Sequence, residues 1–174
     1  TGSVRHRYAW ARGMTLMREV QTRETNARIV VGGGYGPTRR LLADNTIRAD
    51  WYSGLMPGVL EEVLISARAG QPVFLVGTFG GVGRLVADVI EGVFREEATW
   101  SYQKGAPFSE ELVELYRQRN IPFVDYDEAV AFLQGLHFAG LNPMLSEEEG
   151  RELARTGNLY RIIELVVRGL ANCC

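Results

Sequence analysis

Two short apolar runs, each ending in a cluster of glycines and followed by a helical pattern, constrain this fold more than any other feature. The first run, 27–31, is rich in β-branched residues and ends at Gly32, Gly33, Gly34, Tyr35 and Gly36. The second run, 72–76, ends at Gly77, Thr78, Phe79, Gly80 and Gly81. Continuous apolar runs of this length are typical of strands buried on both faces of a parallel sheet. We therefore predict an α/β fold, a Rossmann-like open parallel sheet flanked by helices.

The rest of the chain alternates helical patterns with polar connections. Helical spacing predicts helices over 4–26, 57–69, 82–92, 110–119, 128–136, 151–155 and 159–170, and a further short strand over 122–126. Ser109 is the expected N-cap of the fourth helix, and residues 146–149 resemble a capping box. The polar segment 37–57 predicts an inserted loop, and residues 140–174 a helical C-terminal extension of one domain spanning 1–174. We expect the apolar face of the last helix to pack on the domain's own sheet, with a subunit interface as the alternative.

Composition favours a soluble, cytoplasmic protein that binds neither a membrane nor nucleic acid. The chain is 46% hydrophobic and 23% charged, and no apolar run approaches the roughly 20 residues that cross a bilayer. Nine arginines and three acidic residues make the first 48 residues basic, but these arginines are not interleaved with aromatic residues as in nucleic-acid surfaces. Neither the isolated His6 and His137 nor the adjacent Cys173 and Cys174 has metal-ligand spacing.

The two glycine turns carry the predicted chemistry. Because parallel strands end at the same edge of a sheet, the turns bring backbone N–H groups and helix N-termini together, where a phosphate is electrostatically favoured. Glycine suits such turns since a Cβ atom would block close backbone approach and disfavour positive φ. The sequence therefore predicts a site for an anion or a nucleotide at this edge.

Residues 14–76 resemble the core of the LOG proteins, in which a Met- and Arg-bearing helix precedes an apolar strand, a glycine-rich motif ending in glutamate, and a second strand. The corresponding residues are Met17, Arg18, 29–31, Gly32, Gly33, Gly34, 58–62 and 70–75. The chain is more closely similar to SLOG domains linked to TIR domains in bacterial antiphage systems. That likeness rests on Met56, Pro57, Gly58, Val59, Leu60, Glu61 and Glu62, on residues 77–81, and on residues 140–143.

The resemblance implies that the chain is the C-terminal part of a SLOG domain, because complete members have further strand–helix units before the first helix seen here. Residues 1–3 then fit a remnant of a cloning vector. It also implies a ligand site formed by Arg18, Gly32, Gly33, Gly34, Tyr35, Arg39, Met56, Pro57, Gly58, Glu61, Glu62, Thr78, Phe79, Gly80 and Gly81. Arg40 is a further candidate for a charge contact, and Tyr35 or Phe79 for base stacking.

By that resemblance the domain senses a cyclic or NAD-derived nucleotide, without a further cofactor or metal, and controls a TIR effector domain that cleaves NAD. The effector would lie in the same or a partner chain, and the assembly would be a homo-oligomer. One alternative is a LOG-like nucleotide N-glycosidase using Arg18 and Glu62, in which the carboxylate stabilises positive charge on the sugar. The other is an oligomerisation module that binds no ligand.

Overall fold

The computed structural model describes residues 3–173, and the side chains of Arg40 and Arg48 lie outside the described set. In chain order the elements are α1 (Val4–Glu24), β1 (Arg28–Val31), β2 (Thr38–Leu41), β3 (Ile47–Asp50), α2 (Gly58–Arg68), β4 (Val73–Val76), α3 (Gly81–Ile90), η1 (Glu96–Ala98), α4 (Trp100–Gln103), α5 (Ser109–Gln118), α6 (Tyr126–Leu141), α7 (Glu147–Arg155) and α8 (Leu159–Ala171).

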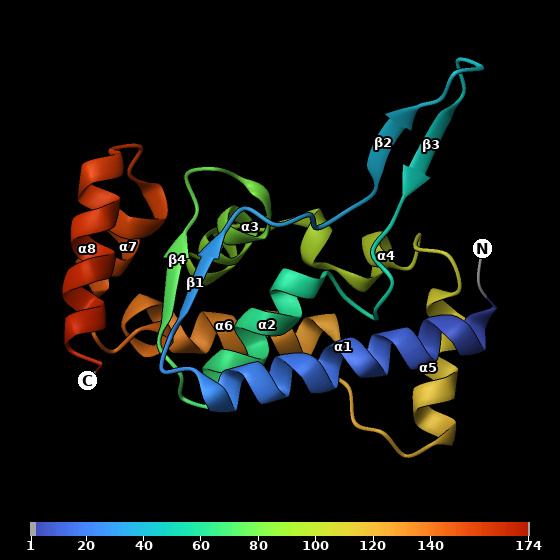
Figure 1. The fold of residues 1–174 in the computed structure, drawn as a ribbon, viewed down its shortest axis with the longest axis horizontal. Helices are drawn as coiled ribbons and strands as arrows, with labels where there is room; N and C mark the ends of the chain where they lie inside the picture. The colour runs from blue at the N-terminus through green and yellow to red at the C-terminus, as the bar shows by residue number, and fades with distance from the viewer. Residues whose placement is uncertain (1–2, 174) are drawn as a thin grey trace.

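The central feature is a parallel pair of strands, β1 and β4, joined through α2 (Figure 1). Their register runs from Arg28 opposite Val73 to Val31 opposite Val76. Both strands therefore end at the same edge, so the two glycine turns follow side by side. Helices flank the sheet on both faces, which confirms the predicted α/β, Rossmann-like architecture.

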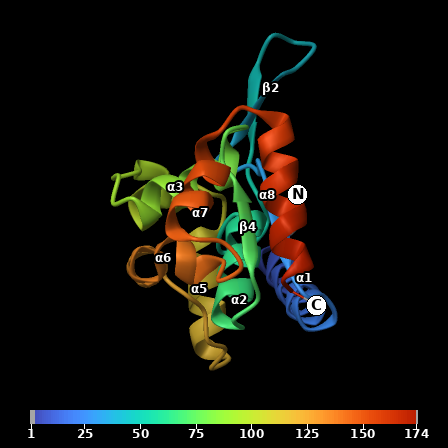
Figure 2. The same cartoon turned by 90° about the vertical axis from the view of Figure 1, so that its left-hand side faces the viewer.

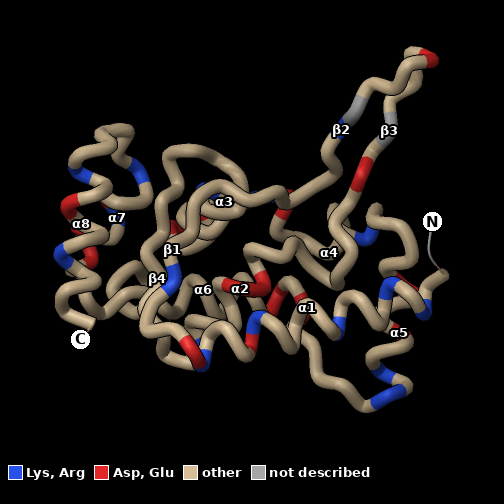
Figure 3. Tube along the Cα trace, viewed as in Figure 1, with Lys and Arg blue, Asp and Glu red and all other residues tan. Residues whose placement is uncertain are grey.

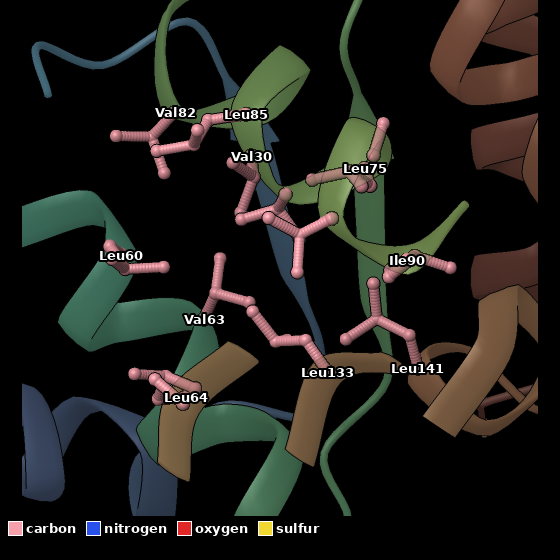
Figure 4. Packing of buried hydrophobic residues seen from close by; sticks show 14 of the residues in the cluster. Val30, Leu60, Val63, Leu64, Leu75, Val82, Leu85, Ile90, Leu133 and Leu141 are labelled. Atoms are coloured by element: carbon pink, nitrogen blue, oxygen red, sulfur yellow. The ribbon is translucent and has the colours of Figure 1, made fainter. Parts of the chain in front are cut away.

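The sheet separates two apolar layers. Val30 and Leu75 point into the larger core, where they meet α2, α3 and α6 (Figure 4). Phe74 and Val76 point the other way and pack against Leu165 of α8. Figure 2 shows α8 on the opposite side of β4 from α3 and α6, which confirms that the last helix packs on the domain's own sheet. The outer face of α8 is exposed, at Leu159, Tyr160, Ile163 and Val167.

The segment predicted as a loop, 37–57, contains a β-hairpin, so that prediction was wrong in part. Strands β2 and β3 pair antiparallel from Thr38 opposite Asp50 to Leu41 opposite Ile47, and they project away from the body of the molecule (Figure 1). Asn45 takes a φ of 61° at the tip, a conformation that asparagine tolerates better than most residues. Apolar and polar residues alternate too little in this polar segment to indicate strands.

Two other local predictions were wrong. Residues 122–126 form no strand, because Asp125 instead caps α6 by accepting the backbone N–H of Glu128. The N-cap of α5 is Phe108, at a φ of 61°, while the Ser109 hydroxyl donates to the carbonyl oxygen of Lys104. The capping box before α7, between Ser146 and Glu149, is confirmed.

Candidate functional site

The site begins with Arg18, which α1 presents to α2. Ala11, Arg18 and Thr22 are the buried residues of α1, and their spacing places them on one face of the helix. Arg18 donates through Nη1 to Glu61 and through Nε to Oε1 of Glu62, the latter at 3.2 Å. In Figure 3 the acidic start of α2 lies beside a basic position of α1. A side chain that is only 11% exposed is thus held in one orientation.

Further polar groups extend these contacts into a network. Nη1 of Arg28 donates to Oε2 of Glu62 at 3.0 Å, and Nε of Arg28 donates to the Ser66 hydroxyl at 2.7 Å. The Thr15 hydroxyl donates to Oε1 of Glu61. Two guanidinium groups therefore face two carboxylates, and the network is formally neutral. Sequence reasoning missed Thr15, Arg28 and Ser66; the available signals were the four-residue spacing of Glu62 and Ser66 and an arginine opening an apolar strand.

The first turn of α2 lies directly against Arg18. A Cβ atom on Gly58 would overlap Nη2 of Arg18 and lie 3.3 Å from its Cζ, so glycine permits this close approach. Arg18, Met14, Tyr52 and Gly58 are among the residues around a small cavity of about 90 Å³. The first backbone N–H groups of a helix have no partner within the helix, and they form its positive end. The geometry therefore combines a buried guanidinium with a helix N-terminus, a combination that suits a phosphate.

Tyr52 borders the same small cavity as a neutral hydroxyl. Its Oη donates to Oε1 of Gln103 at 2.7 Å, and burial raises its pKa to about 12. At neutral pH the cavity therefore gains a polar group without gaining a negative charge.

The two glycine turns contact each other, as expected, but in a way that changes the predicted anion site. Gly33 and Gly81 both have positive φ, 92° and 63°. The backbone N–H of Val82 donates to the Gly33 carbonyl at 2.7 Å, and that of Gly83 donates to the Gly32 carbonyl at 2.9 Å. Because the first turn uses these two N–H groups, they cannot also bind the phosphate that we expected at the start of α3.

A family model described as SLOG cluster2 matches residues 1–153. The chain belongs to this SLOG family. Neither the curated proteins nor the solved structures contain a match to the chain. The matched range covers Arg18, both glycine turns and all of α2, whereas α8 lies beyond it. Membership of the SLOG family indicates a nucleotide-related function.

The structure brings only part of the predicted ligand set of this SLOG domain together. Arg18, Gly58, Glu61 and Glu62 meet at the start of α2, where Met56 and Pro57 are buried and Pro57 is the N-cap. Neighbouring Met17 is 39% exposed, so Arg18 is the residue of the Met–Arg pair that reaches the site. Gly32, Gly33, Gly80 and Gly81 form the interlocked turns, and Gly34 is exposed beyond them.

The candidates for base stacking and charge contacts are placed differently from one another. The half-buried Tyr35 ring packs against the core, and the Arg95 guanidinium lies 5.9 Å from its centroid. Phe79 is 61% exposed on the second turn, beside the partly buried Thr78. Arg39 is exposed on β2 of the projecting hairpin (Figure 1), and the Arg40 side chain lies outside the described residues.

A second charged cluster fixes the helices behind the glycine turns of the SLOG domain. Asp88 of α3 is bonded to Arg84 at 3.0 Å, to Arg155 of α7 at 2.7 Å and to Arg95. Burial alone would raise the pKa of Asp88, but the hydrogen bonds from these three arginines outweigh it and lower the pKa. The cluster therefore ties α3 to α7 and belongs to the scaffold of the site.

Across residues 3–173, no three His, Cys, Asp or Glu side chains are grouped so that they could hold a metal ion. In the same part of the chain, no helix combines the length and apolar character needed to cross a membrane.

Proposed function

We propose that this SLOG domain binds the phosphate of a nucleotide at the N-terminus of α2 and acts as a sensor. The observation that carries the proposal is the position of Arg18, buried against Gly58 and fixed by Glu61 and Glu62. The described hydrogen bonds of Arg18 use Nε and Nη1, and Nη2 lies beside the helix N-terminus. A guanidinium fixed in this way is organised before a phosphate arrives, which lowers the entropic cost of binding.

The same network favours sensing over catalysis. In the LOG-like glycosidases that this chain resembles, the last glutamate of the glycine-rich motif stabilises positive charge on the sugar. The corresponding residue here is Glu62. Glu62 already accepts hydrogen bonds from Arg18 and Arg28. Two adjacent guanidinium groups offset its negative charge, so little of it remains for an oxocarbenium-like sugar.

For the signal and the output, we propose a cyclic or NAD-derived nucleotide and a TIR effector domain that cleaves NAD in cytoplasmic antiphage defence. Support comes from the likeness of 56–62 and 77–81 to TIR-linked SLOG domains. Binding would activate the effector by favouring an assembled homo-oligomer, which requires the ligand to bind that state more tightly than the resting one. The exposed outer face of α8 is available for such an assembly.

Thermal unfolding of the protein with a panel of nucleotides tests the proposal. The panel contains AMP, ADP-ribose, cyclic ADP-ribose, NAD and cyclic di- and trinucleotides, with light scattering for assembly and chromatography for cleavage. A ligand at 100 times its dissociation constant stabilises the folded state by about 2.7 kcal/mol. For a chain of this size that is a rise of about 5–10 °C in Tm.

Two lysine variants on α1 provide the control. Arg18→Lys keeps the charge but loses the planar fork, so we expect the ligand-induced shift to disappear. Arg23→Lys, at an exposed position of the same helix, should retain the full shift. Equal shifts in the two variants, or no shift with any nucleotide, would contradict the proposal.

The glycosidase alternative needs Arg18 and Glu62 side by side, and Nε of Arg18 lies 3.2 Å from Oε1 of Glu62. It predicts release of a free base from the nucleotide, abolished by Glu62→Gln. The oligomerisation alternative is favoured by the exposed Tyr160, Ile163 and Val167 of α8. It predicts association at low protein concentration without nucleotide, abolished by Ile163→Asp.

A further inference from the structure

A larger cavity lies on the other flank of α1 from the small cavity at Gly58. Its volume is about 440 Å³, which falls within the range of about 300–1,000 Å³ typical of small-molecule sites. It opens between α1, α2 and the irregular segment 121–124 that precedes α6. The proposed phosphate site does not use this space, although Met56 and Glu61 of the 56–62 motif border it.

The two cavities are separated by the contact of α1 with α2. Arg12, Thr15 and Glu19 border the larger cavity, whereas Trp10, Met14 and Arg18 border the smaller one. Helical spacing places these two sets on different flanks of α1. Both cavities reach Ala11, which is buried at the contact. A ligand of the larger cavity therefore occupies a different space from a phosphate bound at Gly58.

The body of the larger cavity is apolar and partly aromatic. Leu64 and Ile65 of α2 form one wall, and Phe123 and Val124 belong to the opposite segment. The Phe123 ring meets the buried Tyr116 ring edge to face, with centroids 5.9 Å apart. Aromatic side chains favour further ring contacts in such offset or edge-on arrangements. The cavity thus suits an aromatic ring better than a flexible polar chain.

Glu61 supplies a hydrogen-bond acceptor to the cavity. The Glu61 carboxylate accepts from the Thr15 hydroxyl through Oε1 and from Arg18 through Oε2. A carboxylate has about four acceptor positions, so Glu61 can accept a further donor. Burial raises the pKa of the nearby Tyr116, so that hydroxyl is neutral and can donate or accept.

Charge balance limits what the cavity can accept. Glu61 belongs to the neutral network with Glu62, Arg18 and Arg28, and at the rim Arg68 is paired with Glu128. An anion next to Glu61 would be repelled by its carboxylate, and a cation would compete with Arg18 for it. An uncharged donor adds a charge-assisted hydrogen bond to Glu61 without either penalty.

We infer that this cavity binds an uncharged aromatic heterocycle that donates an N–H group to Glu61. The ring lies between the apolar wall of α2 and the segment 121–124. Because Glu61 also holds Arg18, a bound heterocycle is coupled to the orientation of the guanidinium beside Gly58, and the coupling is reciprocal.

Indole and 1-methylindole form a matched pair of probes, because the second lacks the N–H donor. Their binding is measured by titration of the ¹⁵N-labelled protein, with inorganic phosphate titrated separately. We expect saturable shifts of the amides of 61–65 and of Ile121, Phe123 and Val124 with indole. Loss of a hydrogen bond to a charged acceptor should make 1-methylindole bind about ten-fold or more weakly.

Ile65→Trp fills the cavity and should weaken indole binding at least about ten-fold, whereas Ile47→Trp, exposed on the hairpin strand β3, should leave it unchanged. Ile121→Trp fills the cavity from the opposite wall and replaces Ile65→Trp if that variant misfolds. Equal binding of the two probes, unchanged indole binding in both filled variants, or shifts confined to other regions would overturn the inference. If the filled variants still bind phosphate, their loss of indole binding is a property of the larger cavity and not of the proposed nucleotide site.

Discussion

Gly58→Ala is the substitution that most directly examines the proposed phosphate site. Alanine normally stabilises a helix relative to glycine by about 0.5–1 kcal/mol. At Gly58, however, the added Cβ atom overlaps Nη2 of Arg18 and lies 3.3 Å from Cζ. To regain ordinary separation the guanidinium must move by about 1 Å, which strains its bonds to Glu61 and Glu62.

Two opposing effects set the magnitude of the Gly58→Ala result. Loss of one charge-assisted hydrogen bond costs about 1.5–3 kcal/mol, and the helical gain offsets up to about 1 kcal/mol of it. We expect a net loss of about 1–2 kcal/mol in the free energy of unfolding and a lower Tm by about 2–8 °C. Added phosphate should restore less stability than it does in the wild type, because the fixed guanidinium is displaced.

Gly13→Ala is the matched control for Gly58→Ala. Gly13 lies inside α1, and nothing lies within 4 Å of the position that its Cβ atom would take. This variant should be stabilised by about 0.5–1 kcal/mol and respond to phosphate like the wild type. Thermal unfolding by circular dichroism, with and without phosphate, measures both variants. If Gly58→Ala is stabilised to the same extent as Gly13→Ala, the close approach of Arg18 has no energetic role and the reasoning fails.

Three further predictions concern the scaffold, each measured by urea unfolding. Asp88→Asn should lower the free energy of unfolding by about 3 kcal/mol near pH 7. The pKa of Asp88 is lowered in the folded state, so the stabilisation by the Asp88 carboxylate is complete above the unfolded pKa of about 3.9 and fades as the pH falls through the folded pKa. A destabilisation by Asp88→Asn that persists near pH 2 would refute this prediction. Gly81→Ala combines a φ of 63° with a clash against the Gly33 carbonyl and should cost at least about 2 kcal/mol; a neutral result would contradict the interlocked turns. Leu165→Ala, at a fully buried position on Phe74, should cost about 2–5 kcal/mol, and a cost below 1 kcal/mol would mean that α8 is loosely held.

Features that depend on neighbours in the sequence could be predicted. The strands at 28–31 and 73–76 were evident because a continuous apolar run stopped by glycine has few other structural interpretations. The capping box at Ser146 follows from a four-residue pattern whose partners are local. For the same reason the seven predicted helices were placed to within five residues at each end, whereas the short helices η1 and α4 were not predicted.

Features that depend on distant partners could not be predicted. Arg18 and Glu61 are 43 residues apart, and only the packing of α1 on α2 brings them together. An apolar segment such as 122–126 has the same sequence pattern whether it forms a strand or borders a cavity. Here residues 122–124 border a cavity. The glycine turns were recognised, yet the use of the α3 N–H groups by the first turn depends on the spacing of the two strands in the sheet.

That interlock has a consequence for the dynamics of the domain. Because the carbonyl groups of Gly32 and Gly33 hold the amides of Val82 and Gly83, the loop after β1 cannot open without loosening the first turn of α3. Both amides belong to buried residues, so their hydrogen exchange reports the free energy of this local opening and not surface exposure. Two resonances would therefore follow the motion of a whole loop, and slower exchange at both would show that a bound molecule had restrained it.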